Sequence, residues 1–385
     1  MPETVVWSFP TRILFGAGST SRVGDELKSL GSKRAFVVTD AGVRGAGLVD
    51  PVVEALEAAG IESVVFDGIS SNPLESEVLA ASEAYKNAKC DGVVAVGGGS
   101  PLDVGKLVRL AATHPLPLAQ YDDAIDGWQK VTKPVPPMVA IPTTAGTGSE
   151  VGRSGVVTIQ ATNRKVVIFA PRLLPNVAIL DPKITETMPP RITAATGMDA
   201  LTHCIEAYCA LGDHPMADAI ALQGIELCGK YLETAVHDGK DLEARGAMLK
   251  ASMMGAVAFQ KGLGACHSLA HPLSAEHHLH HGLANALCLP AVLDFNRSAV
   301  SEKIARIAKL LGARGENTET LAFECSGAVR ALRKKTGLAE GLGAAGVPED
   351  GLSKLAKLAL EDACHRSNPR ACTEEDLLSL YKASF

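Results

Sequence analysis

Short apolar runs alternate with amphipathic segments over the first part of the chain. Three runs are rich in β-branched residues, as expected for strands buried on both faces of a parallel sheet, and they lie at residues 34–39, 62–66 and 92–96. Helical periodicity fills the segments around them, at residues 19–30, 48–59, 75–88 and 101–112. The connections are short enough for right-handed crossovers. This order predicts an α/β domain with an open parallel sheet and helices on both faces.

The rest of the first half adds further strands. Residues 1–16 contain two β-rich runs, VVWSF and RILFG, which predict a hairpin at a sheet edge. Residues 114–137 are rich in Pro and polar residues and are interpreted as an excursion from the sheet. The remaining predicted strands are at 138–141, 156–160, 165–169 and 177–180, the middle two forming a hairpin.

The strand pattern ends after Pro189 and Pro190, and helical periodicity then continues almost to the C-terminus. Helices are predicted at residues 191–210, 216–236, 241–261, 264–280, 284–294, 299–311, 318–336, 350–360 and 374–384. We therefore place a domain boundary near residue 186. Residues 1–186 are expected to form the α/β domain, and residues 187–385 an all-helical domain.

Composition narrows the functional class. The chain of 385 residues is 46% hydrophobic and 21% charged, the balance of a soluble globular protein. A net charge of -6 without a basic run, and only 4% aromatic residues, argue against nucleic acid and anionic membranes as partners. The N-terminus lacks the pattern of a secretory signal, and no apolar segment approaches the ~20 residues that span a bilayer. The nine cysteines contain no CxxC pair, so we expect reduced thiols and a cytoplasmic location.

Histidines are concentrated between residues 262 and 285. Six of the eleven histidines fall between His267 and His281, and histidine is the commonest metal ligand. His267 and His271 are four residues apart, so they project from one face of a helix. Gly282 is expected to end that helix, leaving His281 at its terminus. The alternative is a polar helix face, or an exposed tract with adventitious metal affinity.

A second segment of the sequence strengthens the prediction of a metal site. Asp199 and His203 are also four apart, in TGMDALTHCIEAY. Such a pair alone is more often a surface or capping pair. Combined with the histidine segment, one carboxylate and two or three imidazoles from two helices suit Fe(II) or Zn(II). Such a set leaves a coordination position open to a substrate oxygen, as catalytic sites require.

Three features at strand ends favour a nucleotide. Glycines 97–99 and Ser100 follow a strand and open a helix, where free amides bind phosphate, although a plain turn is an alternative. Asp103 in the first helical turn is expected to stabilise the helix dipole or contact the ligand. Asp40 directly follows a strand. An acidic residue at such a position accepts hydrogen bonds from the ribose of NAD and repels the extra phosphate of NADP. The alternative is a turn or capping aspartate. The loop PTTAGTGSE offers hydroxyl donors at Thr143, Thr144, Thr147 and Ser149.

Together these residues resemble the iron-containing (group III) alcohol dehydrogenase family, in particular its lactaldehyde/propanediol oxidoreductases. The resemblance covers nearly the full chain. Its motifs are FPTRILFGAG, GGGSPLDVGK, PTTAGTGSEV, ATGMDALTHCIEAY, GLGACHSLAHPL, HHGLANALCLP and SNPR. It implies a Rossmann-like NAD-binding domain and a helical metal-binding domain, with metal and nicotinamide meeting in the cleft. A homodimer or higher oligomer is the family expectation.

The resemblance also implies roles by position. It implies metal ligation by Asp199, His203, His267 and His281, with His271 facing the nicotinamide and substrate and relaying the proton. The implied cofactor contacts are Asp40, Asn72, Gly97, Gly98, Gly99, Ser100, Asp103, Thr143, Thr144, Thr147 and Lys165. The substrate pocket is expected to include Phe259 and Cys364, and the segment Gly152, Arg153 and Ser154. Arg153 would meet an acidic substrate, or else form a plain salt bridge. His277, His278 and His280 are expected at the pocket rim or surface.

The predicted protein is an NAD(H)-dependent alcohol dehydrogenase and aldehyde reductase for a small primary alcohol or hydroxy acid. A bound cation would lower the pKa of the alcohol, and hydride would pass to the nicotinamide. Three alternatives stay open. They are a hydroxyacid–oxoacid transhydrogenase that keeps its cofactor, a lyase of the dehydroquinate-synthase type, and a non-catalytic NAD- or metal-binding protein.

Overall fold

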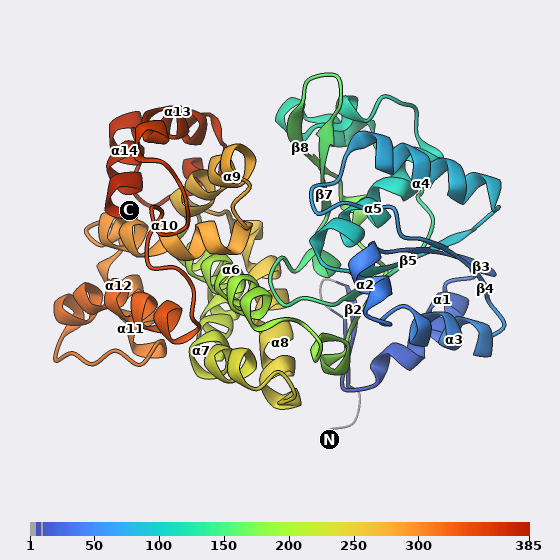
Figure 1. Ribbon diagram of the computed structural model, residues 1–385, viewed down its shortest axis with the longest axis horizontal. Helices are drawn as coiled ribbons and strands as arrows, with labels where there is room; N and C mark the ends of the chain where they lie inside the picture. Colours follow the sequence, from blue (N-terminus) through green and yellow to red (C-terminus); the bar gives the residue numbers. More distant parts are fainter. Residues whose placement is uncertain (1–4, 9–10) are drawn as a thin grey trace. The chain divides into compact units, whose positions relative to one another are not determined.

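The computed structural model describes residues 5–8 and 11–385 (Figure 1). The chain divides into two compact units. The first contains residues up to Thr144 and Gly148–Thr187, and the second contains Ala145–Thr147 and Met188–Phe385. The short segment Ala145–Thr147, which the sequence pattern places in the first domain, therefore belongs to the second unit. No helix among the described residues is long and apolar enough to cross a membrane.

A seven-stranded sheet forms the first unit, in the order β1-β2-β9-β6-β5-β3-β4. All neighbours pair in parallel except β1 and β2, which are antiparallel at one edge. The predicted edge pair is thus confirmed, while residues 9–10, which join it and begin FPTRILFGAG, lie outside the described residues. The strands are β1 Val5–Ser8, β2 Arg12–Phe15, β3 Arg34–Val38, β4 Glu62–Phe66, β5 Gly92–Gly97, β6 Met138–Pro142 and β9 Val177–Leu180.

Alternate side chains of the central strands enter two separate cores. Phe36 and Val38 of β3 join a core with the helices α4 (Glu75–Asn87) and α5 (Gly99–Thr113). Ala35 and Val37 point the other way, into a core with α1 (Val23–Ser29) and α3 (Asp50–Ala58). Figure 1 shows these two pairs of helices on opposite sides of the sheet. Burial on both faces explains why the strands are continuous apolar runs, and it confirms the predicted α/β class.

Smaller elements complete this unit. A separate two-stranded antiparallel sheet, β7 (Ser154–Ile159) and β8 (Arg164–Phe169), matches the predicted hairpin. Residues 118–130 of the predicted excursion form three short 3₁₀ turns. The short helix α2 (Ala41–Gly45) was not predicted, because its five residues, AGVRG, carry no apolar repeat.

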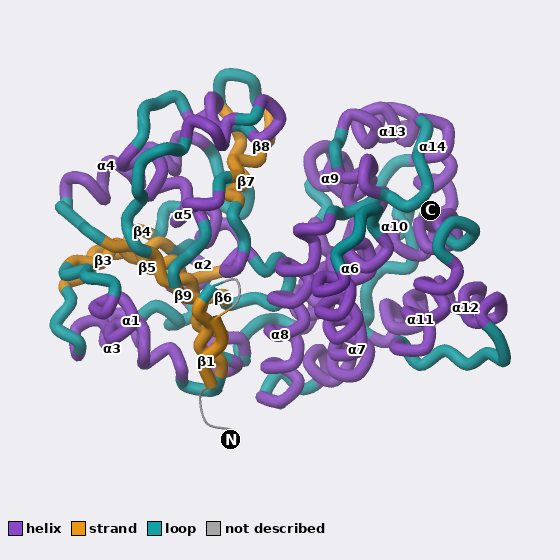
Figure 2. The backbone as a smooth tube through the Cα atoms, turned by 180° about the vertical axis from the view of Figure 1, so that it is seen from behind, coloured by secondary structure: helices purple, strands orange, loops and turns teal. Residues whose placement is uncertain are grey.

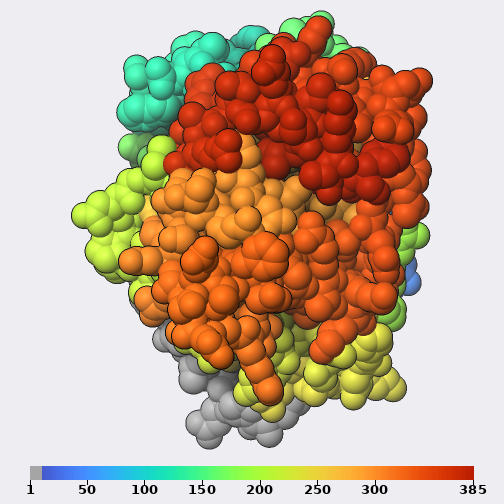
Figure 3. All heavy atoms as spheres, turned by 90° about the vertical axis from the view of Figure 1, so that its left-hand side faces the viewer, coloured from blue at the N-terminus to red at the C-terminus, as the bar shows by residue number. Residues whose placement is uncertain are grey.

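The second unit is entirely helical (Figure 2). Its helices are α6 Pro190–Cys209, α7 Pro215–His237, α8 Leu242–Ala258, α9 Ala265–His277, α10 His281–Asn296, α11 Ser301–Leu310, α12 Thr318–Lys335, α13 Leu352–Glu361 and α14 Glu374–Ala383. On one face of this unit the surface is built by the C-terminal helices, coloured orange to red in Figure 3. All nine cysteines are free, and Cys204, Cys209 and Cys228 are buried in the helices of this unit.

One prediction about the histidine segment is wrong. Gly282 does not end a helix; α9 ends at His277, and His281 is the first residue of α10. The reversal is made by His278, which adopts a left-handed conformation with φ 53°. Gly282 is needed for packing instead, because a Cβ there would lie 2.1 Å from the carbonyl oxygen of Ala195 on α6. His281 is therefore at a helix terminus, but at the N-terminus of the next helix.

Candidate metal centre

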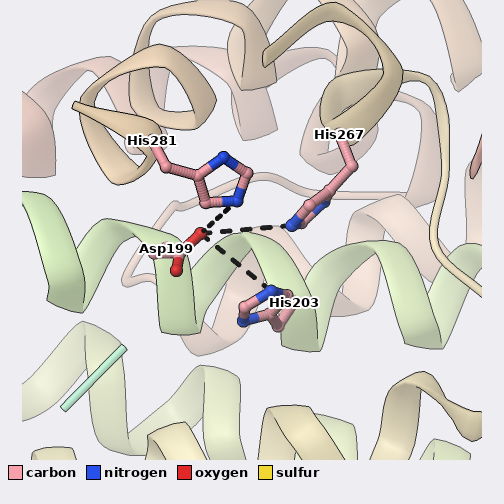
Figure 4. Close-up of side chains that lie close together, drawn as sticks. All are labelled: Asp199, His203, His267 and His281. Carbon is pink, nitrogen blue, oxygen red and sulfur yellow. Dashed lines mark ion pairs between the residues drawn. The ribbon is translucent and has the colours of Figure 1, made fainter. Parts of the chain in front are cut away.

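Four side chains from three helices of the second unit converge on one point (Figure 4). Asp199 and His203 lie one turn apart on α6, His267 comes from α9, and His281 begins α10. The Nε2 atoms of His203 and His267 are each 4.0 Å from Asp199 Oδ1, and Nε2 of His281 is 3.5 Å from it. One nitrogen or oxygen of each residue lies within 4.8 Å of the others. The structure thus brings together the four residues proposed as ligands.

The spacing of these atoms fits a divalent metal ion. Ligand atoms about 2.1 Å from a tetrahedral ion are about 3.4 Å from one another. The separations from Asp199 Oδ1 are 3.5 to 4.0 Å, so a small inward movement of the side chains brings them to that distance. The set contains three imidazole nitrogens and one carboxylate oxygen, which suits Fe(II) or Zn(II). Asp199, His203 and His267 are buried, whereas the His281 side chain is 33% exposed. An ion at this point would be held by the protein on one side and reached by small molecules on the other.

Hydrogen bonds orient the ligand rings from behind. His267 Nδ1 lies 2.5 Å from Oε2 of Glu206, and His203 Nδ1 lies 3.3 Å from the carbonyl oxygen of Gly146. A hydrogen bond at Nδ1 leaves the Nε2 lone pair for a metal. Oε1 of Glu206 also accepts from the backbone N–H of Cys266 at the start of α9, at 2.7 Å. Glu206 therefore fixes both the helix that carries His267 and the orientation of its ring.

An amide lies beside three of the four candidate ligands. Asn285 Nδ2 donates to Asp199 Oδ1 at 2.8 Å. The same nitrogen lies 3.4 Å from His267 Nε2 and 3.2 Å from His281 Nε2. Asn285 is one turn after His281 on α10, so it adds a polar group to the same helix face.

Burial and mutual attraction set the charge states of the cluster. Burial alone would raise the pKa of Asp199, but attraction to the three histidines and the bond from Asn285 lower it to about 2. Burial lowers the pKa of His203 to about 4 and that of His281 well below its ordinary value. For His267, burial also acts to lower the pKa, but the Glu206 carboxylate outweighs it and raises the pKa. At neutral pH a carboxylate and at least two neutral imidazoles thus offer lone pairs to a cation.

Close packing of α10 on α6 gives a first test of this geometry. In Gly282→Ala the new Cβ would lie 2.1 Å from the Ala195 carbonyl oxygen and 3.1 Å from the Asp199 Cβ. The helices must separate, so we expect a loss of about 1–3 kcal/mol in the free energy of unfolding, together with weaker metal binding. Urea unfolding and metal titration measure the two effects.

Gly327→Ala on α12 is the matched control, because its Cβ would meet nothing closer than 4.0 Å. That variant is expected to keep or slightly raise stability. Equal stability of the two variants would contradict the packing argument.

His271 lies next to the ligand cluster but outside it. Its ring stacks on that of His281, with centroids 5.3 Å apart, and meets the edge of the His267 ring at 5.9 Å. Its Nδ1 lies 2.7 Å from Oδ2 of Asp362, and its side chain is 43% exposed. His271, Asp362 and Cys364 form a second group whose donor atoms are mutually close. The position of His271 agrees with a role beside the metal rather than on it.

The predicted phosphate-binding glycines lie where β5 joins α5 in the first unit. Gly97 has φ 152°, and a Cβ there would lie 2.6 Å from Pro101, so this turn requires glycine. Gly99 and Ser100 begin α5, and Ser100 Oγ donates to the carbonyl oxygen of Ser71 at 2.8 Å. The Thr144 hydroxyl lies beside Gly98, and the Thr143 N–H donates to the carbonyl oxygen of Gly97 at 2.9 Å. The structure therefore places the first two threonines at the glycine turn.

Two other predicted cofactor residues meet in the same unit. Lys165 Nζ donates to Oδ1 of Asn72 at 3.4 Å. Asn72 directly follows Ser71, the partner of Ser100, so this pair lies along the same rim as the glycine turn. Thr147, by contrast, belongs to the second unit.

The two predicted acidic residues have structural partners. Asp40 is the N-cap of α2, and its Oδ1 accepts from the N–H of Val43 at 2.9 Å. This is the capping role weighed as an alternative, yet it uses only one of the two oxygens. Asp103 accepts from Ser149 Oγ at 2.6 Å and from the N–H of Val156 at 3.1 Å. Asp103 thus ties α5 to the next loop and to β7, and its direct contact with a nucleotide stays a prediction.

Comparison with known proteins identifies the chain. Residues 10–182 match the description iron-containing alcohol dehydrogenase, and residues 193–385 match Fe-containing alcohol dehydrogenase family, C-terminal. The chain belongs to the iron-containing alcohol dehydrogenase family. The family and the enzyme class predicted from the sequence, an oxidoreductase acting on alcohols and aldehydes, are thereby confirmed.

Relatives within this family carry different substrate names. The chain is 39% identical over 376 residues to an NAD-dependent methanol dehydrogenase of Bacillus methanolicus, covering 97% of this chain and 98% of that protein. It is 40% identical over 383 residues to a 4-hydroxybutyrate dehydrogenase of Cupriavidus necator, covering 97% and 98%. The crystal structure of a 1,3-propanediol oxidoreductase superposes with a TM-score of 0.94 at 40% identity, covering all of both chains.

The residues predicted to line the substrate pocket are divided between the two units. The Phe259 ring packs on that of His203, with centroids 5.2 Å apart, and Cys364 lies beside Asp362. Phe259 therefore borders the candidate centre, whereas Cys364 belongs to the neighbouring group with His271 and Asp362. Gly152, Arg153 and Ser154 belong to the first unit. The guanidinium of Arg153 lies over the Phe169 ring, 5.3 Å from its centroid.

The other histidines of the segment lie away from the donor atoms of the centre. His277 ends α9 and is half-buried, while His278 and His280 are exposed. Exposure agrees with their predicted place at a rim or surface. Neither group of close metal-ligating atoms found among the described residues includes them.

Three residues around the centre were missed from the sequence. Glu206 is seven residues after Asp199, so the helical repeat that links Asp199 to His203 also reaches it. Asn285 is four residues after His281 and had the same signal. Asp362 had none, because it is 91 residues from its partner His271.

Proposed function

We propose that this protein is an NAD(H)-dependent alcohol dehydrogenase and aldehyde reductase that uses a divalent metal, Fe(II) or Zn(II). Its substrate is a small primary alcohol or hydroxy acid. The convergence of Asp199, His203, His267 and His281 within a member of this family is the observation that carries the proposal. Both metals suit the donor set, and the order of affinities favours zinc, so supply decides which is bound.

The three histidines would hold the ion through their Nε2 atoms, and Asp199 would hold it through its carboxylate. An ion bound there would polarise the substrate oxygen and lower the pKa of an alcohol toward neutrality. His271 then takes the alcohol proton at Nε2 and passes it to water, which its exposure of 43% permits. In aldehyde reduction the same nitrogen returns the proton.

The nucleotide part of the proposal rests on the first unit. The amides at the start of α5 and the hydroxyls of Thr143 and Thr144 bind phosphate, while Asn72 and Lys165 contact a ribose. The carboxylate oxygen of Asp40 that the cap does not use accepts from the adenosine ribose and repels an added phosphate. The nicotinamide supplies the hydride chemistry. The relative of Bacillus methanolicus is NAD-dependent by name, which supports this choice of cofactor.

The substrate pocket is proposed to include Phe259 and Cys364, with Arg153 reading the charge of the substrate. The relatives act on methanol, a hydroxy acid and a diol, so small oxygenated substrates are the common class. We also propose a cytoplasmic homo-oligomer, supported by nine free thiols and the family expectation. Light scattering of the purified protein measures the oligomeric state.

Steady-state kinetics test the function. Anaerobically Fe(II)-loaded protein, with a zinc-loaded sample alongside, is given NADH and a panel of neutral, carboxylated and sulfonated small aldehydes. We expect turnover with one of the three classes of aldehyde. We also expect a higher kcat/KM with NADH than with NADPH, because Asp40 repels the extra phosphate of NADPH. A preference for NADPH would contradict the role of Asp40.

If no aldehyde of the panel is reduced while the protein still binds NADH, the proposed dehydrogenase activity is refuted. The same protein is then assayed with a hydroxy acid and an oxo acid without added nucleotide. Turnover there would identify a transhydrogenase with bound cofactor.

A further inference from the structure

A carboxylate behind His271 has no part in the mechanism described so far. Asp362 directly follows α13, and its Oδ2 lies 2.7 Å from Nδ1 of His271 on α9. No hydrogen bond to Nε2 of His271 is found within residues 5–8 and 11–385. Of the two ring nitrogens of His271, Nδ1 is therefore hydrogen-bonded to Asp362, and Nε2 has no hydrogen bond to the described residues.

The other oxygen of Asp362 fixes the orientation of the carboxylate. Oδ1 accepts from Ser268 Oγ and from the backbone N–H of Cys364, both at 2.8 Å. Ser268 Oγ in turn accepts from the N–H of His365 at 2.8 Å. Because two donors occupy Oδ1, Oδ2 is the oxygen left to face the histidine, and an ionised carboxylate can only accept there.

Acceptance at Oδ2 determines which ring nitrogen of His271 carries the proton. A neutral imidazole has one N–H and one lone pair, and a hydrogen bond from Nδ1–H leaves the lone pair on Nε2. The ring is also held in place, since it stacks on His281 with an interplanar angle of 15°. Tautomer and ring position are both set by neighbours.

We propose that Asp362 is a positioning residue for the reaction: it holds His271 in the tautomer with the proton on Nδ1, so that Nε2 accepts the proton of the substrate alcohol. The proposal rests on the proposed function, in which His271 moves that proton. It assigns a role in catalysis to a residue that touches neither substrate nor cofactor.

A purely structural role is the alternative. Asp362 and His271 also link α13 to α9, and a contact of that kind stabilises without affecting the reaction. The chain contains a matched example, because Lys354 of α13 forms an ion pair with Glu276 of α9. Glu276→Gln therefore removes a charged contact between the same two helices without touching the histidine.

Asp362→Asn separates the two roles. The amide oxygen keeps the two donors from Ser268 and Cys364, which turns the NH₂ group toward Nδ1 of His271. An NH₂ group can only donate, so the imidazole must present its lone pair at Nδ1 and carry its proton on Nε2. The variant is nearly isosteric, and its main effect is to reverse the tautomer.

Nitrogen chemical shifts report the tautomer without any activity. Metal-free protein labelled with [15N]histidine is examined by long-range 15N–1H correlation spectroscopy, with the His271 signals assigned by their loss in His271→Gln. We expect the Nδ1–H tautomer in the native chain and the Nε2–H tautomer in Asp362→Asn. An Nε2–H tautomer in the native chain would overturn the proposal even if the variant failed to fold.

Kinetics of the metal-loaded variants complete the test. We expect Asp362→Asn to lower kcat by about 10- to 100-fold with KM and metal content little changed, and Glu276→Gln to leave kcat unchanged. If His271→Gln lowers kcat but Asp362→Asn does not, the inference fails and the proposed function stands. If His271→Gln leaves kcat unchanged, the proton-transfer role of His271 fails, and the inference fails with it.

Discussion

Replacement of His267 by alanine is expected to abolish metal-dependent turnover. The substitution removes one of the four donor atoms and leaves the Glu206 carboxylate, which now contacts Nδ1, buried without its partner. Stabilisation of the developing charge by a bound metal contributes several kcal/mol, so we expect kcat/KM to fall by more than about 1,000-fold. Metal content should fall from one ion per chain to nearly none.

Metal analysis and steady-state kinetics on the same sample check this result. His280→Ala is the control, since His280 is exposed, lies in the same histidine-rich segment and makes no capping hydrogen bond. The control should keep its metal and its activity. Near-normal turnover of His267→Ala with its metal content verified would show that His267 is not a ligand.

Glu206→Gln is expected to weaken metal binding although Glu206 is not a ligand. Oε1 of Glu206 accepts from the N–H of Cys266, so the amide oxygen of glutamine keeps that place and its NH₂ group faces His267 Nδ1. The imidazole must then carry its proton on Nε2, the atom that faces Asp199. Partners of this kind typically contribute 10- to 100-fold to metal affinity, and we expect the Kd to rise by about that factor.

Competition with a chelating dye measures the Kd directly. Glu233→Gln is the control, because it removes an exposed ion pair with Lys335 on the surface of the same unit. Its Kd should equal that of the native chain. An unchanged Kd in Glu206→Gln would mean that the carboxylate does not orient His267.

Much of the fold follows from local patterns. The strands of the parallel sheet are buried on both faces, so they appear in the sequence as uninterrupted apolar runs, and β4 and β9 have the predicted bounds. The helix α2 is too short for a periodic signal. Gly282 was misinterpreted because glycine after a helical segment usually ends it, whereas this glycine allows α10 to approach α6.

The residues of the candidate site also differ in how far the sequence could predict them. Asp199 and His203 could be predicted from spacing, because they lie one turn apart on the same helix. Glu206 had the same signal and was overlooked. His267 and His281 lie on two other helices, so spacing indicated only a histidine-rich segment, and the family resemblance supplied their roles. Asp362 could not be found from spacing, since its contact with His271 joins segments that are distant in the chain. The carboxylate of Asp103 accepts hydrogen bonds from Ser149 and Val156, which spacing did not indicate, and its contact with a nucleotide stays a prediction.

Anaerobic titration of the metal-free protein with Fe(II) tests the central claim most directly. NADH-dependent reduction of the best aldehyde is recorded after each addition, with a parallel series for Zn(II). The four-ligand centre predicts no activity without metal, a linear rise, and saturation at one ion per chain. Full activity in verified metal-free protein, or activity that does not respond to added metal, would contradict a catalytic metal at Asp199, His203, His267 and His281.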